Sequence, residues 1–254
     1  MKKSLLFFLF VAPILLALGG CQKTISSKTG TIKISFRNMV NASPMVLGPT
    51  PYTNPFGESF TISKFKYYIS NVRLGLSGVA TTATEKNSYH LIDQGQSGSL
   101  HFSFDAEENS FITLSFLLGV DSTRNVSGAQ TGALDPLNDM FWTWNSGYIM
   151  AKMEGTSPQS NLVGNRIEYH IGGFSGVNNS LKQIGLLFPA GKKVVIKQGQ
   201  TSEIMVEADF NKWWQTPNDI KIADLPVCTT PGVLAKKVAD NYADMFTVTD
   251  VVNN

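Results

Sequence analysis

The chain has 254 residues, of which 21 are Lys or Arg and 19 are Asp or Glu. Without Lys2 and Lys3, which lie in a segment that we expect to be removed, basic and acidic residues balance. Because no basic patch is present, we predict no nucleic-acid partner. The length is enough for one large β domain with a sizeable core.

The first twenty residues have the layout of a secretory signal: two lysines, an apolar stretch from Leu5 to Leu18, and small residues at the end. The apolar stretch is shorter than the roughly 20 residues that span a bilayer. Leu18-Gly19-Gly20-Cys21 matches the bacterial lipobox, in which the cysteine thiol receives a diacylglycerol. We therefore expect a signal peptide at 1–20, a lipid on Cys21, and a location in the bacterial cell envelope, at the outer membrane.

Residues 21–30 are rich in Ser, Thr and Lys and predict a flexible tether. After it, apolar and polar residues alternate in short runs, which is typical of half-buried β-strands. The runs are Ile32–Phe36, Phe65–Ile69, Leu100–Phe104, Ile112–Leu118, Ile167–Ile171, Ile184–Phe188, Val194–Lys197 and Ile204–Phe210. The alternation slips by one residue near Asn71, which predicts a β-bulge. Four prolines in Ser43–Gly57 predict an extended loop.

A helix is predicted near the end of the chain. Thr230 can cap it, Pro231 suits the first helical position, and apolar residues such as Leu234 and Val238 follow at helical spacing. We find no repeat and no linker that would separate domains. The fold prediction for 31–254 is therefore a single all-β domain, an antiparallel β-sandwich with a C-terminal helix.

The usual catalytic motifs are missing, so we predict that the chain is not an enzyme. There is no phosphate-binding glycine loop, no HExxH, no CxxC and no Gly-x-Ser-x-Gly elbow. The three histidines, His90, His101 and His170, are spread over different predicted strands. The second cysteine, Cys228, cannot form a disulfide with an acylated Cys21 and suits a small buried position.

The segment Asn138–Gly155 concentrates aromatic residues and methionines. Trp142 and Trp144 lie two positions apart, so on an extended backbone their indoles share a face. Together with Tyr148 they could pack in the core, stack on a sugar, or flank a soft metal ion. The residues themselves leave these three interpretations open.

At this segment the chain begins to resemble the MbnP-like proteins, a family named for a copper-related partner encoded beside methanobactin genes. The resemblance covers nearly the whole chain after the predicted signal. It is carried by six blocks in family order: FTISKFKYYISNVRL at Phe60–Leu74, YHLID at Tyr89–Asp93, LLGVDS at Leu117–Ser122, MFWTWNSGYIMAKMEG at Met140–Gly155, YHIGG at Tyr169–Gly173 and VADNYADMF at Val238–Phe246.

The resemblance implies a β-sandwich envelope protein that is associated with copper. It also implies that a tryptophan is oxidised to kynurenine by a separate dihaem enzyme, with Trp142 and Trp144 as candidates. The candidate copper ligands are His170 and, second to it, His90. His170 alternates with Tyr169 and Ile171 and should therefore face away from the core, free for a metal or for a hydrogen bond to a neighbour.

The alternative function is an envelope lipoprotein that binds glycan or a partner protein without a metal. Its basis is the number of aromatic residues on a β scaffold, namely Trp142, Trp144, Trp213 and Trp214. Indole faces stack on sugar rings, so such residues would have to lie at the surface.

Overall fold

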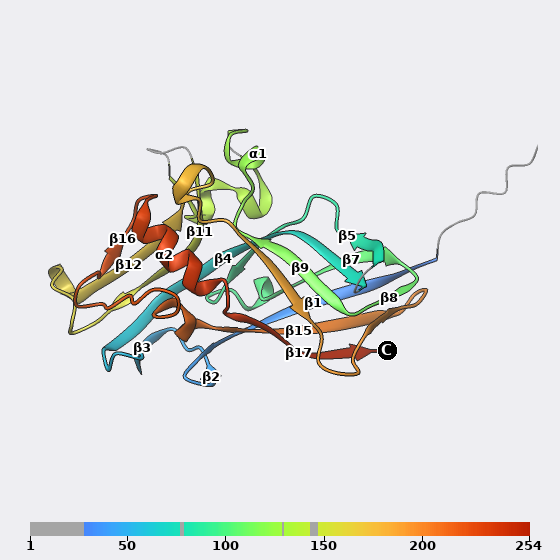
Figure 1. Cartoon of the computed structure of the whole chain (residues 1–254), viewed down its shortest axis with the longest axis horizontal. Coiled ribbons are helices and arrows are strands. Elements are labelled where there is room, and N and C mark those ends of the chain that lie inside the picture. Colours follow the sequence, from blue (N-terminus) through green and yellow to red (C-terminus); the bar gives the residue numbers. More distant parts are fainter. Residues whose placement is uncertain (1–27, 77–78, 129, 143–146) are drawn as a thin grey trace, which may run out of the picture.

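The structure is a computed structural model that describes residues 28–76, 79–128, 130–142 and 147–254. Within these ranges two β-sheets lie face to face, with a large apolar core between them (Figure 1). This confirms the predicted β-sandwich with a helix near its C-terminal end. No helix in the described ranges has the length and apolar character of a membrane span.

The smaller sheet, sheet A, is built around β1 (Thr29–Val40), which begins inside the predicted tether. Its other strands are β2 (Ser43–Pro44), β7 (His101–Glu107), β15 (Thr201–Asp209) and β17 (Phe246–Asn253). β1 runs parallel to β15 and antiparallel to β7. The sandwich is therefore not purely antiparallel, because residue alternation fixes the buried face of a strand but not the direction of its partner.

The larger sheet, sheet B, is organised by the 18-residue strand β4 (Ser59–Leu76). Its order is β13-β9-β4-β11-β12-β16, and β3, β5 and β6 also pair with β4 while β10 pairs with β11. The bounds are β3 (Gly48–Thr53), β5 (Val79–Thr84), β6 (Tyr89–Asp93), β9 (Thr113–Leu118), β10 (Phe141–Trp142), β11 (Gly147–Thr156), β12 (Arg166–Gly172), β13 (Lys182–Leu187) and β16 (Val227–Cys228). A separate pair joins β8 (Asn109–Phe111) to β14 (Val194–Ile196).

The bulge predicted near Asn71 is present in β4. Asn71 has a positive φ of 54°, and the pairing of β4 with β9 shifts register between Ser70 and Arg73. From Phe65 to the bulge, odd-numbered residues such as Ile69 face the core, and after it Val72 does so. One extra residue therefore exchanges the two faces of the strand, and Arg73 points outward instead of inward.

Two local predictions are wrong. Ser43–Gly57 is not wholly a loop, because β2 and β3 lie within it. Pro44, Pro49 and Pro51 belong to these two strands, each of which pairs with a single neighbour, so the missing N–H is tolerated there. The helix α2 (Val233–Tyr242) begins later than predicted, with Gly232 as its N-cap and no capping side chain. Thr230 and Pro231 precede it in an irregular segment, and α2 packs beside β12 (Figure 1).

The remaining helices are short. They are α1 (Ser122–Asn125) and the 3₁₀ turns η1 (Ser97–Ser99), η2 (Gly132–Leu134), η3 (Pro136–Asn138), η4 (Val163–Asn165), η5 (Gly176–Asn178) and η6 (Phe210–Trp213). Asp121 caps α1 and Asp135 caps η3, each by accepting a backbone N–H. These turns lie in the connections between strands.

The apolar residues form two clusters on opposite faces of sheet B. The main core lies between the sheets and includes Phe65, Tyr67 and Met153. The second cluster lies on the outer face of sheet B and contains Tyr68, Val120, Leu134, Met140, Trp142, Tyr148, Ile149 and Met150. Met150 and Met153 therefore face opposite ways and cannot ligate one ion, as their spacing in a strand suggests.

Candidate functional site

Trp142 lies on the outer face of sheet B, at the point where β10, β11 and β12 meet. Its side chain is 6% exposed and packs on Gly172 of β12. A Cβ atom added at Gly172 would lie 2.4 Å from Cζ3 of the indole, so only glycine leaves room for the ring. Gly172 therefore lets the indole of Trp142 lie close against the strand.

Tyr148 belongs to the same outer cluster as Trp142 and is itself firmly held. It is 1% exposed, its hydroxyl donates to the carbonyl of Leu134 at 2.7 Å, and its N–H donates to Asn125 Oδ1 at 2.9 Å. Burial raises the pKa of its phenol. Because both polar groups are used inside the protein, Tyr148 acts mainly as a rigid support for the aromatic segment.

A pocket of about 440 Å³ opens beside Trp142. Apolar parts of its wall come from Trp142, Phe174 and Pro231, and polar parts come from Ser175 and Asn178. A few polar groups on a wall with apolar and aromatic parts are typical of small-molecule sites. The indole of Trp142 thus faces a recess. Its other walls come from the segment between β12 and η5 and from the segment before α2.

His170 lies on the same face of β12 as Gly172, two residues earlier in the strand. Its side chain is 18% exposed, and its Nε2–H donates to Glu154 Oε1 at 2.9 Å. That hydrogen bond, together with Lys64 and against the opposing effect of burial, lowers the pKa of Glu154 to about 2. The carboxylate is therefore ionised and holds the imidazole in place.

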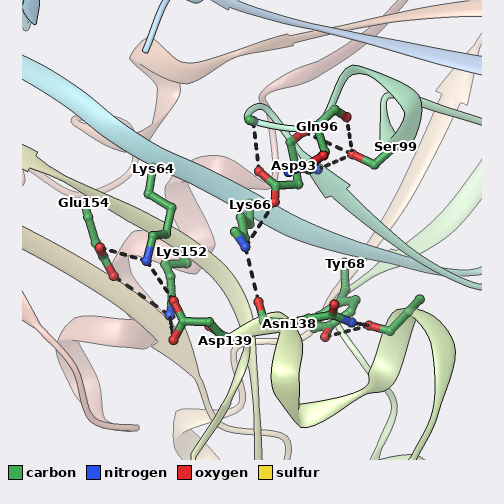
Figure 2. A network of polar contacts seen from close by, with 12 residues as sticks. Lys64, Lys66, Tyr68, Asp93, Gln96, Ser99, Asn138, Asp139, Lys152 and Glu154 are labelled. Atoms are coloured by element: carbon green, nitrogen blue, oxygen red, sulfur yellow. Dashed lines mark hydrogen bonds and ion pairs between the residues drawn. The ribbon is translucent and has the colours of Figure 1, made fainter. Parts of the chain in front are cut away.

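A network of charges continues from Glu154 across the outer face (Figure 2). Lys64 Nζ lies 2.7 Å from Asp139 and 3.2 Å from Glu154, and Lys152 Nζ lies 3.0 Å from Asp139. The Lys152 side chain is only 2% exposed, and burial lowers its pKa despite these partners. Burial raises the pKa of Asp139, but Lys64 and Lys152 outweigh this effect and lower it below its usual value. An ammonium group this deeply buried requires such partners.

Side chains on the same outer face hydrogen-bond to the backbone of the segment that precedes Trp142. Lys152 donates to the backbone carbonyl of Asp139, and Lys66 Nζ donates to that of Asn138 at 3.2 Å (Figure 2). Tyr68 donates its hydroxyl to the carbonyl of Ala133 at 3.0 Å. Residues 132–139 are thereby fastened across sheet B, and the position of Trp142 depends on polar contacts that start three residues before it.

The predicted site residues are only partly brought together. Trp142 packs on the face of β12 to which His170 belongs, whereas Trp144 and Cys21 lie outside the described residues. His90 lies on β6, where its Nε2 hydrogen-bonds Glu85 and its ring stacks on Phe102 at 3.5 Å. Two strands, β11 and β4, separate β12 from β6, so His90 is on the order of 15 Å from His170. These two histidines cannot ligate one metal ion.

The metal-binding capacity of the described residues is limited. Nowhere in them do three His, Cys, Asp or Glu side chains gather into a group that could hold an ion. His170 and Glu154 offer one imidazole and one carboxylate, two donors that suit copper(II), beside the ammonium groups of Lys64 and Lys152. This pair fits an exchangeable ion better than a permanent centre.

Comparison with known proteins supplies the family. The family model for MbnP matches residues 29–230, which include most of both sheets. The chain belongs to the MbnP family. MbnP from Methylosinus trichosporium has a similar solved structure, with a TM-score of 0.55 and 12% identity over 89% of this chain and 99% of that one. No curated protein matches the sequence.

Within this MbnP-family fold, two of the tryptophans named for glycan stacking are unsuited to it. Trp213 and Trp214 are each 1% exposed and pack among Phe60, Phe65 and Phe210 in the main core. Cys228 is buried too, and burial raises its pKa to about 11, so its thiol is unreactive. All three residues belong to the main core.

Sequence reasoning missed the charge network of the MbnP chain. Lys152 stands in the nearly continuous apolar run GYIMAKM, where a lysine on a buried strand has to find an anionic partner. That conflict was the available signal. The partner Asp139 could not be identified, because it comes from a loop whose path over sheet B is set by tertiary contacts.

Proposed function

We propose that this chain is a non-enzymatic, copper-associated binding protein of the bacterial envelope, held at the membrane by a lipid on Cys21. The observation that supports this function best is the outer face of β12, where Trp142 of β10 packs on Gly172 and the half-buried His170 lies two residues before that glycine. Membership of the MbnP family supports it as well.

In this proposal copper is a cargo that binds and leaves. His170 provides the imidazole and Glu154 the carboxylate, and the ion replaces the proton that they share in their 2.9 Å hydrogen bond. The neighbouring ammonium groups of Lys64 and Lys152 oppose a second positive charge, which keeps the affinity modest. His90, bonded to Glu85 on β6, would act only as a separate, weaker contact.

Of the two candidate tryptophans, Trp142 is the one that lies within the described residues, and we propose it for conversion to kynurenine. A separate dihaem enzyme would use two molecules of hydrogen peroxide, each a two-electron oxidant, to place two oxygen atoms across the C2–C3 bond of the indole, and the two remaining peroxide oxygens would leave as water. Hydrolysis then releases C2 as formate, so the residue gains about 4 Da. The product carries an aromatic amine and a ketone, which can bind or orient a metal as indole cannot.

A copper titration with matched variants tests the proposal. We expect wild-type protein to bind copper at micromolar concentration, His170→Ala to bind at least about tenfold more weakly, and His101→Ala to bind normally. His101 is an exposed histidine at the start of β7 and serves as the control. Protein that retains no copper, and whose peptide over 141–152 from native cells shows no gain of about 4 Da, would contradict it.

The anchor is tested separately. We expect the protein from native cells to partition into detergent and to carry acyl chains on Cys21, and Cys21→Ser to release it into the aqueous phase. An aqueous wild-type protein would overturn the anchor and leave the copper question untouched.

A second candidate function is favoured by the pocket beside Trp142. Its volume of about 440 Å³ and its aromatic wall of Trp142 and Phe174 suit a sugar ring better than a bare ion. In that case Trp fluorescence changes on addition of a polysaccharide, Phe174→Ala removes the response, and His170→Ala does not. Fluorescence that stays constant across a panel of polysaccharides argues against this function.

A further inference from the structure

The four arginines of the chain fall into two groups. Arg37 pairs with Glu207, and Arg166 pairs with Glu168 at 3.2 Å. Arg73 and Arg124 form no ion pair with a carboxylate in the described part of the chain, and both line one pocket of about 560 Å³. This second pocket lies on the outer face of sheet B beside α1, and its lining differs completely from that of the recess at Trp142.

The β-bulge of β4 is what brings Arg73 to this pocket. With regular alternation, residue 73 would share the inward face of Ile69, whereas the extra residue at Asn71 turns Arg73 outward. Arg73 is exposed, and Ser115 of β9 lies directly across from it in the sheet. Bulges that redirect one side chain are typical of binding sites.

The carboxylate in the pocket, Asp121, is already satisfied by other donors. It accepts the hydroxyl of Tyr89, Nδ2 of Asn71 at 3.3 Å and the backbone N–H of Arg124 at 3.1 Å. Although burial opposes them, these bonds lower the pKa of Asp121, so it stays ionised at neutral pH. Asp121 therefore orders the pocket wall, and among the described residues the two guanidinium groups have no partner carboxylate.

Arg124 is held ready for a ligand. Its Nη1 donates to Gln130 Oε1 at 3.1 Å, and its guanidinium lies 5.3 Å from the centre of the Tyr89 ring. A planar guanidinium fixed over an aromatic ring keeps its remaining N–H groups available in a set geometry. Fixing the side chain before binding reduces the entropy that a ligand has to overcome.

We propose that this pocket binds the oxyanion of a small hydroxylated ligand, a carboxylate or a phosphate group. The two guanidinium groups carry two positive charges, whereas Asp121 contributes one negative charge. Each guanidinium group can bind an oxyanion through two parallel hydrogen bonds. Ser115, Thr123 and Gln183 line the rest of the pocket with groups that hydrogen-bond to hydroxyls. Acidic sugars and sugar phosphates have this chemistry.

Titration of the full folded domain with two probes, glucuronate and inorganic phosphate, tests the site by calorimetry or by NMR of the arginine side chains. We expect at least one probe to bind at millimolar concentration and to bind more weakly as salt is raised. Arg73→Gln should weaken binding about tenfold, and Arg124→Lys should weaken it as well because the fork is lost. The better probe identifies the group as a carboxylate or a phosphate.

Arg166→Gln is the matched control, since Arg166 is another exposed strand arginine but already has a carboxylate partner. We expect it to bind as wild type does. The site is overturned if neither probe binds, or if Arg166→Gln weakens binding as much as Arg73→Gln. These measurements involve neither copper nor His170, so their result does not depend on whether the proposed copper function is correct.

Discussion

The two faces of sheet B are built from the same strands by different physical means. Toward sheet A, β4 and β11 present Phe65, Tyr67 and Met153 to a core of apolar side chains. On the outer face, the next residues along these strands include Lys152 and Glu154, and a loop is fastened over them by charges. Apolar burial stabilises the inner face without requiring exact partners, whereas the outer face keeps its geometry only while each charge keeps its own partner.

The largest effect is expected from damage to the inner face. Phe116 is fully buried, and its ring contacts Phe36 and Phe246 at centroid distances of 6.2 and 5.1 Å. Phe116→Ala should lower the free energy of unfolding by about 3–5 kcal/mol through lost burial and a cavity. Urea denaturation measures it, and a loss below 1 kcal/mol would show that this core is looser than the structure indicates.

Gly172→Ala targets the packing of Trp142 on the outer face. The added methyl group would meet the indole at 2.4 Å and the carbonyl oxygen of Tyr148 at 3.0 Å, so Trp142 has to move. We expect a loss of about 1–3 kcal/mol in the free energy of unfolding and a red shift of Trp fluorescence. Gly185→Ala is the control, because nothing lies within 4 Å of a Cβ there. An unchanged emission spectrum in Gly172→Ala would mean that Trp142 does not rest on this strand.

Asp139→Asn tests how much the negative charge of Asp139 contributes to stability, because asparagine has nearly the same size and shape. Asp139 has a left-handed backbone with φ 61°, which asparagine tolerates, so the substitution leaves the loop intact but removes a partner of the buried Lys152. We expect a loss of about 1–2 kcal/mol in the free energy of unfolding. In the double variant with Lys152→Met, which no longer buries the ammonium group, part of this loss should return. Strictly additive losses in this cycle would indicate that the two residues are not coupled.

The smallest effect is a dependence on acid pH. The pKa of Glu154 is about 2 in the folded protein and near 4.5 when it is unperturbed, so its contribution to stability is complete above pH 4.5 and is lost as the pH falls toward 2. The side chain is 25% exposed, so solvent screening limits this contribution to about 1 kcal/mol. The difference in unfolding free energy between wild type and Glu154→Gln should therefore shrink from pH 5 to pH 2. A difference that stays constant would mean that Glu154 is not stabilised by His170 and Lys64.

The sequence predicted the inner face well and the outer face poorly. Strands such as β1 and β9, and the bulge at Asn71, follow from alternation alone, because a buried face repeats every second residue. That His170 points away from the main core was predicted in the same way, although its side chain is only 18% exposed. The partner of Lys152, the turn of residues 132–139 and the parallel direction of β15 depend on contacts between distant segments, which no local pattern encodes.

The parallel pairing of β1 with β15 also constrains how this chain can fold. The hydrogen-bonded side chains of Ser35 and Glu203 are 168 residues apart in sequence, so the first strand of sheet A has to wait for nearly the whole chain before its central neighbour exists. Contacts between such distant residues slow folding, because the entropy of a long loop is lost before any contact compensates for it. Sheet A therefore cannot be completed before β15 is available for pairing, even where strands of sheet B have already paired.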